Sequence, residues 1–374
     1  MQKIKFSKPD IKDNDLKNIT KVIKSGWLTH GKYTKEFERE FCDYTKTKYS
    51  ALVSSCTAGL HLIFLSLNIR KGDEVIVPAQ THTATSHAVE YTGARAVFAD
   101  VDPVTGNILP EEIIKNINKK TKGVVCVHMT GISCKMDEIL KITKKYKIHL
   151  IEDCAHGLGT KFNNKHVGNF GIASSFSFYP TKQITIGEGG MVTSNNKTLI
   201  NKIQSLKAFG INKPPEKRTK PGFYNVNFLG YNYRTTDFQA ALGYFQIKRY
   251  DRNLKKRLLN ANTYHKFLKN NKNIILPKFS KDNSYYVFQI ICKNQLLREM
   301  IAKNLKIKKY GYGILYSLPV PWLNYYKKKY KFNYKNLVNS KIYSKRCISL
   351  PCHNYLQKSE IEMICKIINK YSSY

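Results

Sequence analysis

One lysine in this sequence stands in a setting that suits covalent chemistry. Lys182 ends the segment SFYPTK at residues 177–182, where a strand pattern runs into a proline-defined turn, and a glycine turn, GEGG at 187–190, follows. A lysine held on a rigid turn in a partly desolvated pocket can lose its proton and attack an aldehyde. The alternative is a solvated surface lysine, the usual state in a chain with 63 Lys and Arg residues. Lys182 is therefore a candidate nucleophile that other residues have to support.

A second group of polar residues follows another strand pattern, in the segment IEDCAH at residues 151–156. A carboxylate directly after a buried strand is costly unless a cation meets it. The protonated nitrogen of a pyridine ring is such a cation, and the pairing keeps a cofactor ring an effective electron sink. Glu152 and Asp153 point to opposite faces if the strand geometry persists, so at most one of them takes this role. His156 is within reach of the same site, and the alternative for the carboxylate is a helix cap.

A third segment, SSCTAG at residues 54–59, follows a short apolar run and precedes a helical pattern. Small residues at a strand-to-helix turn leave backbone N–H groups free at the positive end of the helix. That arrangement suits a phosphate group, with the Thr57 hydroxyl as a further donor. The alternative is an ordinary Ser or Thr N-cap. Each of the three segments is a weak signal alone, but their order along one chain carries more weight.

The elements that must position these residues alternate between strand and helix from about residue 12 to 200. Short apolar runs predict strands at 51–53, 74–77, 96–99, 124–127, 149–152 and 175–178. This alternation predicts an α/β fold on a mostly parallel sheet, whose carboxyl edge binds ligands. A long helical pattern then runs from Gln239 through Leu258 and beyond, and shorter strands and helices follow from about residue 270. We expect a large domain over residues 1–250 and a smaller α+β domain over residues 251–374.

The composition restricts the class of protein. No stretch approaches the roughly 18 apolar residues that a membrane span needs, and no signal peptide is evident, so we expect no membrane partner and a cytoplasmic location. Nine cysteines without a CxxC pair favour reduced core thiols over disulfides or a zinc site, and we expect no metal. The formal net charge of +37 would attract nucleic acid or phosphorylated substrates. No recognition motif accompanies the dispersed lysines, so we expect no specific nucleic-acid partner.

The order and spacing of these segments resemble the DegT–StrS family of sugar aminotransferases, which have the type I aminotransferase fold. The likeness extends from about Gly26 to His353. Besides the three segments above, it rests on SGWLT at 25–29, LHL at 60–62, GYNYR at 230–234 and, weakly, LPCH at 350–353. The resemblance implies that the cofactor is pyridoxal 5'-phosphate, which becomes pyridoxamine 5'-phosphate between the two halves of the reaction.

The resemblance also implies roles for individual residues. Lys182 forms a Schiff base with the cofactor and later moves protons, and Asp153 pairs with the pyridine nitrogen. His156 lies near the phenolic oxygen of the cofactor. The residues implied to hold the phosphate are Cys56 through its backbone, Thr57, Ser177, and Asn232, which reaches the phosphate of the neighbouring subunit. A homodimer with a shared active site is therefore part of the expectation. Looser candidates for substrate contact are Trp27, Thr29 and Tyr316.

Departures from the family pattern bear on the site, and one is Tyr179, which stands before Pro180 where a histidine is common. In segment 78–85, His82 occupies the position at which the family usually has an aromatic residue that stacks on the cofactor ring. An imidazole can also stack flat, and it adds a proton site. Residues 310–330 match the family poorly, so the sequence leaves substrate specificity open there.

The activity that the resemblance implies has two halves. An amino donor, expected to be glutamate, transfers its amino group to the cofactor. The cofactor then aminates a ketone on a nucleotide-diphospho-sugar, for glycan or polysaccharide biosynthesis, and Lys182 returns a proton to the sugar carbon. Two alternatives remain open. One is a keto-deoxysugar dehydratase with the same cofactor, in whose relatives a histidine replaces the lysine; the other is a non-catalytic regulatory relative.

Overall fold

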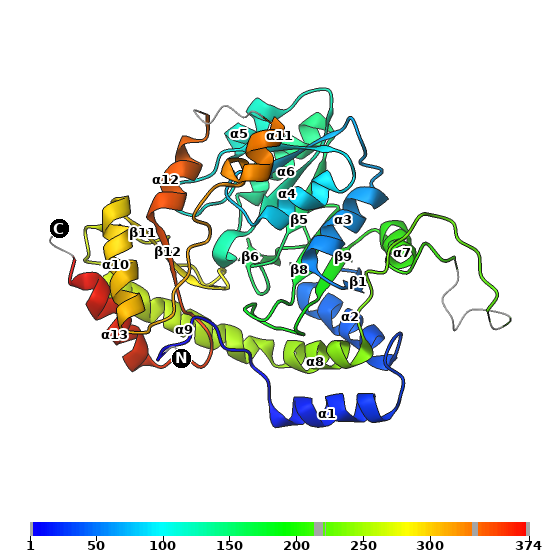
Figure 1. Ribbon diagram of the computed structural model, residues 1–374, viewed down its shortest axis with the longest axis horizontal. Coiled ribbons are helices and arrows are strands. Elements are labelled where there is room, and N and C mark those ends of the chain that lie inside the picture. Colours follow the sequence, from blue (N-terminus) through cyan, green and yellow to red (C-terminus); the bar gives the residue numbers. More distant parts are fainter. Residues whose placement is uncertain (1–2, 213–219, 221, 331–335, 372–374) are drawn as a thin grey trace.

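The computed structural model describes residues 3–212, 220, 222–330 and 336–371. Its larger sheet has seven strands in the order β1–β9–β8–β5–β4–β2–β3 (Figure 1). These are β1 Tyr49–Val53, β2 Glu74–Pro78, β3 Arg95–Ala99, β4 Thr121–Val127, β5 His149–Asp153, β8 Ala173–Ser177 and β9 Gly190–Ser194. Strands β8, β5, β4, β2 and β3 run parallel, and β9 is antiparallel to both β8 and β1. The sheet is therefore mostly parallel, as the alternation of strand and helix patterns predicted.

Two layers of helices cover the faces of this sheet. The helices before residue 250 are α1 Asp13–Lys24, α2 Lys32–Thr45, α3 Cys56–Ser66, α4 Thr83–Glu90, α5 Pro110–Asn116, α6 Met136–Tyr146, α7 Lys197–Leu206 and α8 Asp237–Lys248. Successive strand residues face opposite sides of a sheet. Val53, Val75 and Ile151 accordingly share a core with α3, α4 and α7. Their strand neighbours Leu52 and Leu150 face the opposite layer, to which α2, α5, α6 and α8 belong.

A smaller antiparallel sheet, in the order β10–β11–β12, lies beside the first (Figure 1). The remaining elements are the hairpin β6 Lys161–Phe162 and β7 Lys165–His166, the strands β10 Ile274–Ile275, β11 Phe288–Cys292 and β12 Cys347–Leu350, and the helices α9 Tyr250–Leu268, α10 Gln295–Ile307, α11 Asn324–Tyr330, α12 Val338–Arg346 and α13 Lys358–Asn369. Helices α9, α10 and α13 share its core, which Ile4 joins. The domain boundary expected after residue 250 falls at the start of α9 and stays a prediction. Among the described helices, none has both the length and the apolar composition needed to cross a membrane.

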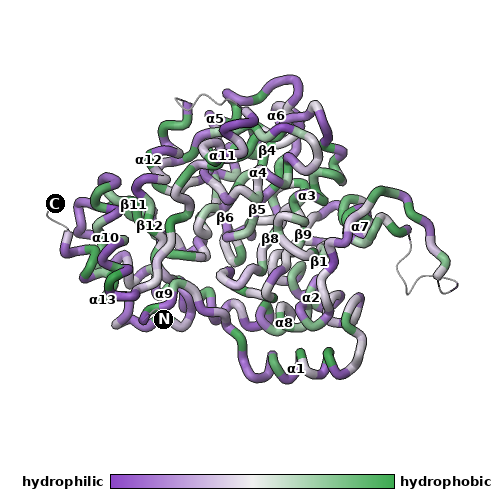
Figure 2. Tube along the Cα trace, in the orientation of Figure 1, coloured by the Kyte–Doolittle hydropathy of each residue, from purple (hydrophilic) through white to green (hydrophobic). Residues whose placement is uncertain are grey.

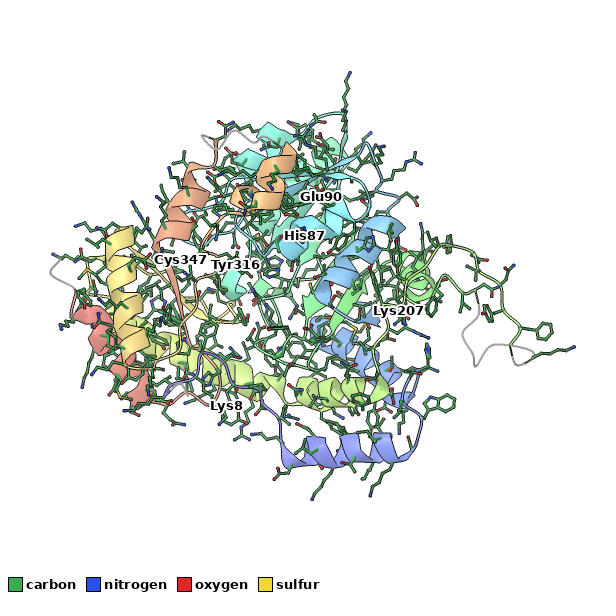
Figure 3. All side chains as sticks on the ribbon, in the orientation of Figure 1. Lys8, His87, Glu90, Lys207, Tyr316 and Cys347 are labelled. Carbon is green, nitrogen blue, oxygen red and sulfur yellow. The ribbon has the colours of Figure 1, made fainter. Side chains whose placement is uncertain are left out.

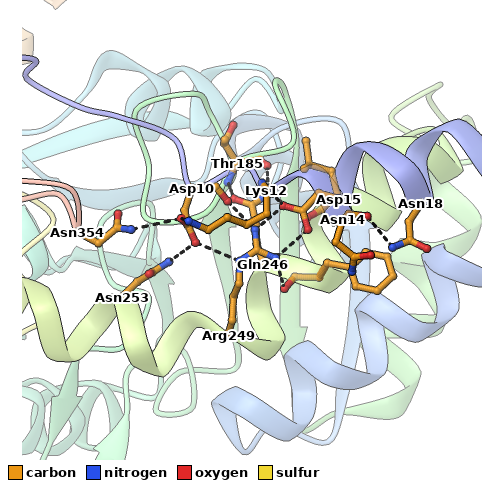
Figure 4. Close-up of polar contacts among 12 residues, drawn as sticks. Asp10, Lys12, Asn14, Asp15, Asn18, Thr185, Gln246, Arg249, Asn253 and Asn354 are labelled. Carbon is orange, nitrogen blue, oxygen red and sulfur yellow. Dashed lines mark hydrogen bonds and ion pairs between the residues drawn. The ribbon is translucent and has the colours of Figure 1, made fainter.

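The helical pattern expected to continue unbroken past residue 258 is two helices, because the chain leaves the helix at Arg249 (φ −110°, ψ 6°). The Arg249 guanidinium donates to Phe245 O at 2.7 Å and also binds Asp10 and Asp15 of the N-terminal segment (Figure 4). Together these bonds use all five N–H donors of the side chain. The break between α8 and α9 is therefore one of the points at which the N-terminal segment is held.

Candidate active site

The ends of neighbouring strands bring the three segments singled out from the sequence to one edge of the large sheet. Asp153 ends β5 and Ser177 ends β8. Gly190, the first residue of β9, pairs with both Ser177 and Val53, so the end of β1 and the start of α3 reach the same edge. Lys182 lies in the turn that joins β8 to β9. The strand register, rather than any local feature of the sequence, makes these residues neighbours.

The Asp153 carboxylate is 4% exposed and is held through both oxygens. Its Oδ2 accepts a hydrogen bond from Thr85 Oγ1 at 2.8 Å, and its Oδ1 accepts one from the Ala155 N–H at 3.0 Å. The Cys56 thiol lies 3.8 Å from Asp153 Oδ1, and the charge of Lys182 also acts on this thiol, so the three side chains are neighbours. Burial, together with the charge of Asp153, raises the pKa of that thiol well above its usual value. Cys56 therefore offers the site its backbone N–H and no thiolate.

Glu152 points away from this group, which decides between the two adjacent carboxylates. It accepts hydrogen bonds from His128 Nε2 at 3.1 Å and from the backbone N–H groups of Gly168, Phe170 and Gly171 at 2.7–2.8 Å. Although His128, Glu152 and Cys154 hold ligand-type atoms within 4.8 Å of one another, these four bonds take up the lone pairs of the carboxylate. We therefore interpret Glu152 as a structural group that fastens the loop before β8.

Side chains from distant parts of the chain fix the turn that carries Lys182. Thr181 Oγ1 lies 2.9 Å from the Tyr286 hydroxyl, and Lys182 Nζ lies 4.7 Å above the centroid of the Tyr286 ring. Beyond the lysine, the buried Gln246 of α8 accepts from the Thr185 N–H at 3.0 Å and donates to the Thr185 carbonyl at 2.6 Å (Figure 4). The half-buried Lys182 thus stands on a turn that is anchored on both sides.

His156 is a buried, neutral imidazole next to this lysine. Its ring stacks on Tyr286 with centroids 4.4 Å apart and an interplanar angle of 12°. Burial, with the nearby charge of Lys182, holds the pKa of His156 well below its usual value. Because Nδ1 accepts a hydrogen bond from the Thr130 N–H at 3.4 Å, the ring proton resides on Nε2. His156 is therefore a single-proton donor at pH 7.

The start of α3 presents backbone donors at the same edge. Ser55 is the N-cap, and its hydroxyl accepts from the Ala58 N–H at 3.0 Å, so the N-cap interpretation holds for Ser55. Cys56 and Thr57 occupy the first turn, where a helix offers no internal acceptor to the N–H groups. A Cβ added at Gly190 would lie 2.6 Å from the Cys56 nitrogen, so β9 approaches this turn as closely as only glycine allows. Donors at a helix start suit an anion.

His82 and Tyr316 lie together beside this group. His82 is the exposed N-cap of α4, where its Nδ1 accepts from the Ala84 N–H at 3.2 Å. The rings of His82 and Tyr316 meet edge to face with centroids 5.6 Å apart, and the Tyr316 carbonyl accepts from Gln80 Nε2 at 2.7 Å. Figure 3 shows Tyr316 near the middle of the molecule. Tyr316 thus lies against the start of α4, the helix whose Thr85 bonds Asp153.

Three residues expected from the sequence lie elsewhere on the chain surface. Asn232 is exposed and accepts a hydrogen bond from Arg234 Nε at 3.0 Å. Trp27 is 64% exposed in the segment after α1, and Thr29 is exposed two residues later. None of the contacts given for these three residues in the described part of the chain reaches Lys182. Their roles stay predictions, and that of Asn232 requires a second subunit.

Sequence reasoning missed Thr85, Tyr286 and Gln246. Thr81 and Thr85 stand four residues apart, one just before α4 and one within it, and this spacing is only a faint signal in the sequence. Tyr286 and Gln246 lie about 60 to 100 residues from Lys182 in a chain with 25 tyrosines, and nothing local distinguishes them. Contacts of this kind depend on how the second, smaller sheet and α8 pack against the first.

The chain is similar to known proteins along nearly its whole length. Residues 9–369 match the DegT/DnrJ/EryC1/StrS aminotransferase family. The chain is 32% identical to GDP-perosamine synthase of Escherichia coli O157:H7, with 100% of both chains covered. It is 33% identical to the spore coat polysaccharide biosynthesis protein SpsC of Bacillus subtilis, over 97% of this chain and 95% of the relative. The structure of PseC of Helicobacter pylori, an aminotransferase of pseudoaminic acid biosynthesis, superposes with a TM-score of 0.92 at 27% identity over 100% of both chains.

The match to the family covers nearly the whole chain, and the relatives are similar over their full lengths. The fold is that of the sugar aminotransferases, as expected from the sequence. The chain belongs to the DegT/DnrJ/EryC1/StrS aminotransferase family.

Proposed function

We propose that this chain is a pyridoxal-phosphate-dependent aminotransferase that transfers the amino group of glutamate to a keto-sugar carried on a nucleotide. The observation that carries the proposal is the position of Lys182. It stands on an anchored turn, at the sheet edge where the Asp153 carboxylate and the start of α3 also lie. Family membership supports the reaction class.

The groups at this edge fit the three functional ends of pyridoxal phosphate. The buried Asp153 carboxylate suits the protonated pyridine nitrogen. The N–H groups of Cys56 and Thr57, with the hydroxyls of Thr57 and Ser177, suit the phosphate. The Lys182 amine suits the aldehyde. A protein of Streptococcus pneumoniae described as a sugar aminotransferase, at 27% identity, has structures in PLP and PMP forms, which supports the same cofactor here.

The bound cofactor would supply an electron sink for negative charge at the reacting substrate carbon. The residues of the chain then bind and orient the cofactor and the substrates, and they move protons. Lys182 Nζ takes the proton from the amino-acid carbon and later returns one to the sugar carbon. Asp153 would pair with the protonated pyridine nitrogen, and His156, whose Nε2 carries the ring proton, would donate toward the phenolic oxygen. His82 and Tyr316, whose rings meet beside this edge, would contact the cofactor ring.

The substrate class is inferred from the relatives and from charge. Two relatives at 32% and 33% identity are named GDP-perosamine synthase, which points to a nucleotide-diphospho-sugar. The formal charge of +37 would attract a diphosphate to the protein. The name of SpsC supports a role in making a polysaccharide.

We further propose a homodimer in which Asn232 reaches the phosphate of the second subunit. The support is an arm between α7 and α8 that exposes apolar residues, shown as hydrophobic stretches beyond α7 in Figure 2. Phe223 is 69% exposed and Leu229 is 90% exposed. Contiguous apolar surface of this kind marks interaction sites. Asn232 lies in the same arm, three residues after Leu229, and is itself exposed.

We also infer that the enzyme works in the cytoplasm. All nine cysteines are free thiols, and eight of them are buried. Cysteines that stay unpaired are the usual state of a protein in a reducing compartment.

The test is an amination assay with a panel of nucleotide-linked 4-keto and 3-keto sugars. The enzyme loaded with pyridoxal phosphate should yield an amino sugar by mass spectrometry, with one 2-oxoglutarate formed from glutamate for each. Lys182→Ala should be inactive, and Lys248→Ala, an exposed lysine on α8, should be as active as wild type. Loss of water from a keto-sugar without an amino donor would favour the dehydratase. The absence of any glutamate-dependent product would contradict the proposal.

A further inference from the structure

Two buried threonines stand in line behind Asp153, and the reaction described above gives them no role. Thr85 Oγ1 lies 2.8 Å from Asp153 Oδ2, and Thr81 Oγ1 lies 2.8 Å from Thr85 Oγ1. Thr85 is 0% exposed and Thr81 is 3% exposed. A threonine inside a helix commonly bonds a backbone carbonyl one turn back. Thr85 instead bonds a carboxylate 68 residues away in the sequence, which indicates that its hydroxyl serves a tertiary contact.

The chemistry of the three groups fixes the direction of these hydrogen bonds. An ionised carboxylate only accepts, and a hydroxyl has a single proton to donate. Thr85 must therefore donate to Asp153, which leaves its lone pairs for Thr81, and Thr81 must donate to Thr85. Consecutive hydrogen bonds of this kind polarise one another, so the bond from Thr81 strengthens the bond that Thr85 donates to Asp153.

The hydrogen bond from Thr85 also orients the Asp153 carboxylate. Thr85 holds Oδ2, while the Ala155 N–H holds Oδ1 at 3.0 Å. The Cys56 thiol lies 3.8 Å from Oδ1 but only 3.4 Å from the Ser175 carbonyl, so its proton serves that carbonyl better. The strong donors to Asp153 are therefore one hydroxyl and one backbone N–H, and the hydroxyl can be removed by mutation.

We propose that Thr85, supported by Thr81, is a positioning residue that holds the Asp153 carboxylate in place and aimed at the pyridine nitrogen of the cofactor. The inference rests on the proposed function, because it needs a pyridoxal-type ring above Asp153. It adds a specific claim, which is that the protonation of that ring depends on a hydroxyl of α4.

The test uses Thr85→Val, which keeps the shape and removes the hydroxyl, and Thr85→Ser, which restores the hydroxyl. Thr143→Val is the matched control, since Thr143 is a buried helical threonine on α6 that bonds only the nearby Leu140 carbonyl among the bonds described. One measurement is the dissociation constant of pyridoxal phosphate from the apo-protein. The other is the ¹⁵N resonance of cofactor labelled at the pyridine nitrogen, which distinguishes protonated from neutral pyridine.

We expect Thr85→Val to weaken cofactor binding by about 10- to 100-fold, the typical contribution of a hydrogen bond to a charged group. Its nitrogen resonance should move toward neutral pyridine. Thr85→Ser should retain most of the cofactor affinity and most of the wild-type nitrogen resonance, and Thr143→Val should change neither quantity. Thr81→Val, which removes only the outer donor, should shift the resonance in the same direction by less. Thr81→Val replaces Thr85→Val in both measurements if Thr85→Val does not fold.

This inference alone would be overturned if Thr85→Val bound the cofactor as tightly as wild type and its nitrogen resonance did not shift. If Thr85→Val does not fold, the same result in Thr81→Val would overturn it. Loss of thermal stability with an unchanged resonance would also overturn it, because that is the result of a purely structural role. Failure of the wild-type protein to bind pyridoxal phosphate would overturn the proposed function and this inference with it.

Discussion

The substitution Gln246→Glu tests whether the turn that carries Lys182 depends on α8. Gln246 is fully buried and donates through Nε2 to the Thr185 carbonyl at 2.6 Å and to the Leu242 carbonyl at 2.9 Å. A glutamate has the same shape but places a second oxygen against these two carbonyl oxygens. Two hydrogen bonds are lost, at about 1 kcal/mol each, and a buried acceptor left without a donor costs about 1–3 kcal/mol more. We therefore expect the free energy of unfolding to fall by about 3–5 kcal/mol.

Urea unfolding at pH 7 measures this change, and cofactor retention after dialysis measures its effect at the site. Retention should fall, because Thr185 lies three residues beyond Lys182 and its anchor is lost. The control is Gln295→Glu at the exposed start of α10, where the same change of chemistry meets no buried carbonyl. A Gln246→Glu protein as stable as Gln295→Glu would refute the reasoning that Gln246 anchors the turn.

Two further predictions concern acid stability and assembly. Burial lowers the pKa of His166 from 6.5 to about 4, and its Nε2 accepts from the Gly159 N–H, so the folded protein holds the ring neutral. A depressed pKa gives stability that is present above pH 6.5 and is lost as the pH falls toward 4, at about 1.4 kcal/mol per pH unit. His166→Gln should therefore reduce the drop in unfolding free energy between pH 7 and 4.5 by about 2–3 kcal/mol, and an undiminished drop in urea titrations would contradict this. Leu229→Glu should convert a dimer to monomers in light scattering, whereas Leu296→Glu on α10, also exposed, should not; a dimer unaffected by Leu229→Glu would count against the arm as the interface.

The fold was largely predictable because its signals are local. The apolar runs at 51–53, 74–77, 96–99, 124–127 and 149–152 lie within β1 to β5, and 175–178 overlaps β8. Each run is short and bounded, as buried strands are. The break at Arg249 was not predictable, because its guanidinium binds Asp10 and Asp15 more than 230 residues away (Figure 4).

The site was predictable to the extent that strand ends determine it. Asp153, Ser177 and Lys182 meet because parallel strands end at one edge. The strand pattern alone left Glu152 and Asp153 open and the family resemblance favoured Asp153; the structure directs Glu152 to a loop on the other side. Residues that act across packed elements, such as Thr85, leave only a faint trace in the sequence. The roles of Asn232, Trp27 and Thr29 stay predictions, because all three side chains are exposed and lie apart from Lys182 in the described part of the chain.

The proposed activity of this chain depends on a covalent bond between Lys182 and the cofactor. The direct measurement is borohydride reduction of the protein loaded with pyridoxal phosphate, followed by mass spectrometry of its peptides. We predict one stable pyridoxyl group per chain on the peptide that contains Lys182, and none in Lys182→Ala. A pyridoxyl group on another lysine, or an undiminished level of labelling in Lys182→Ala, would contradict the central claim.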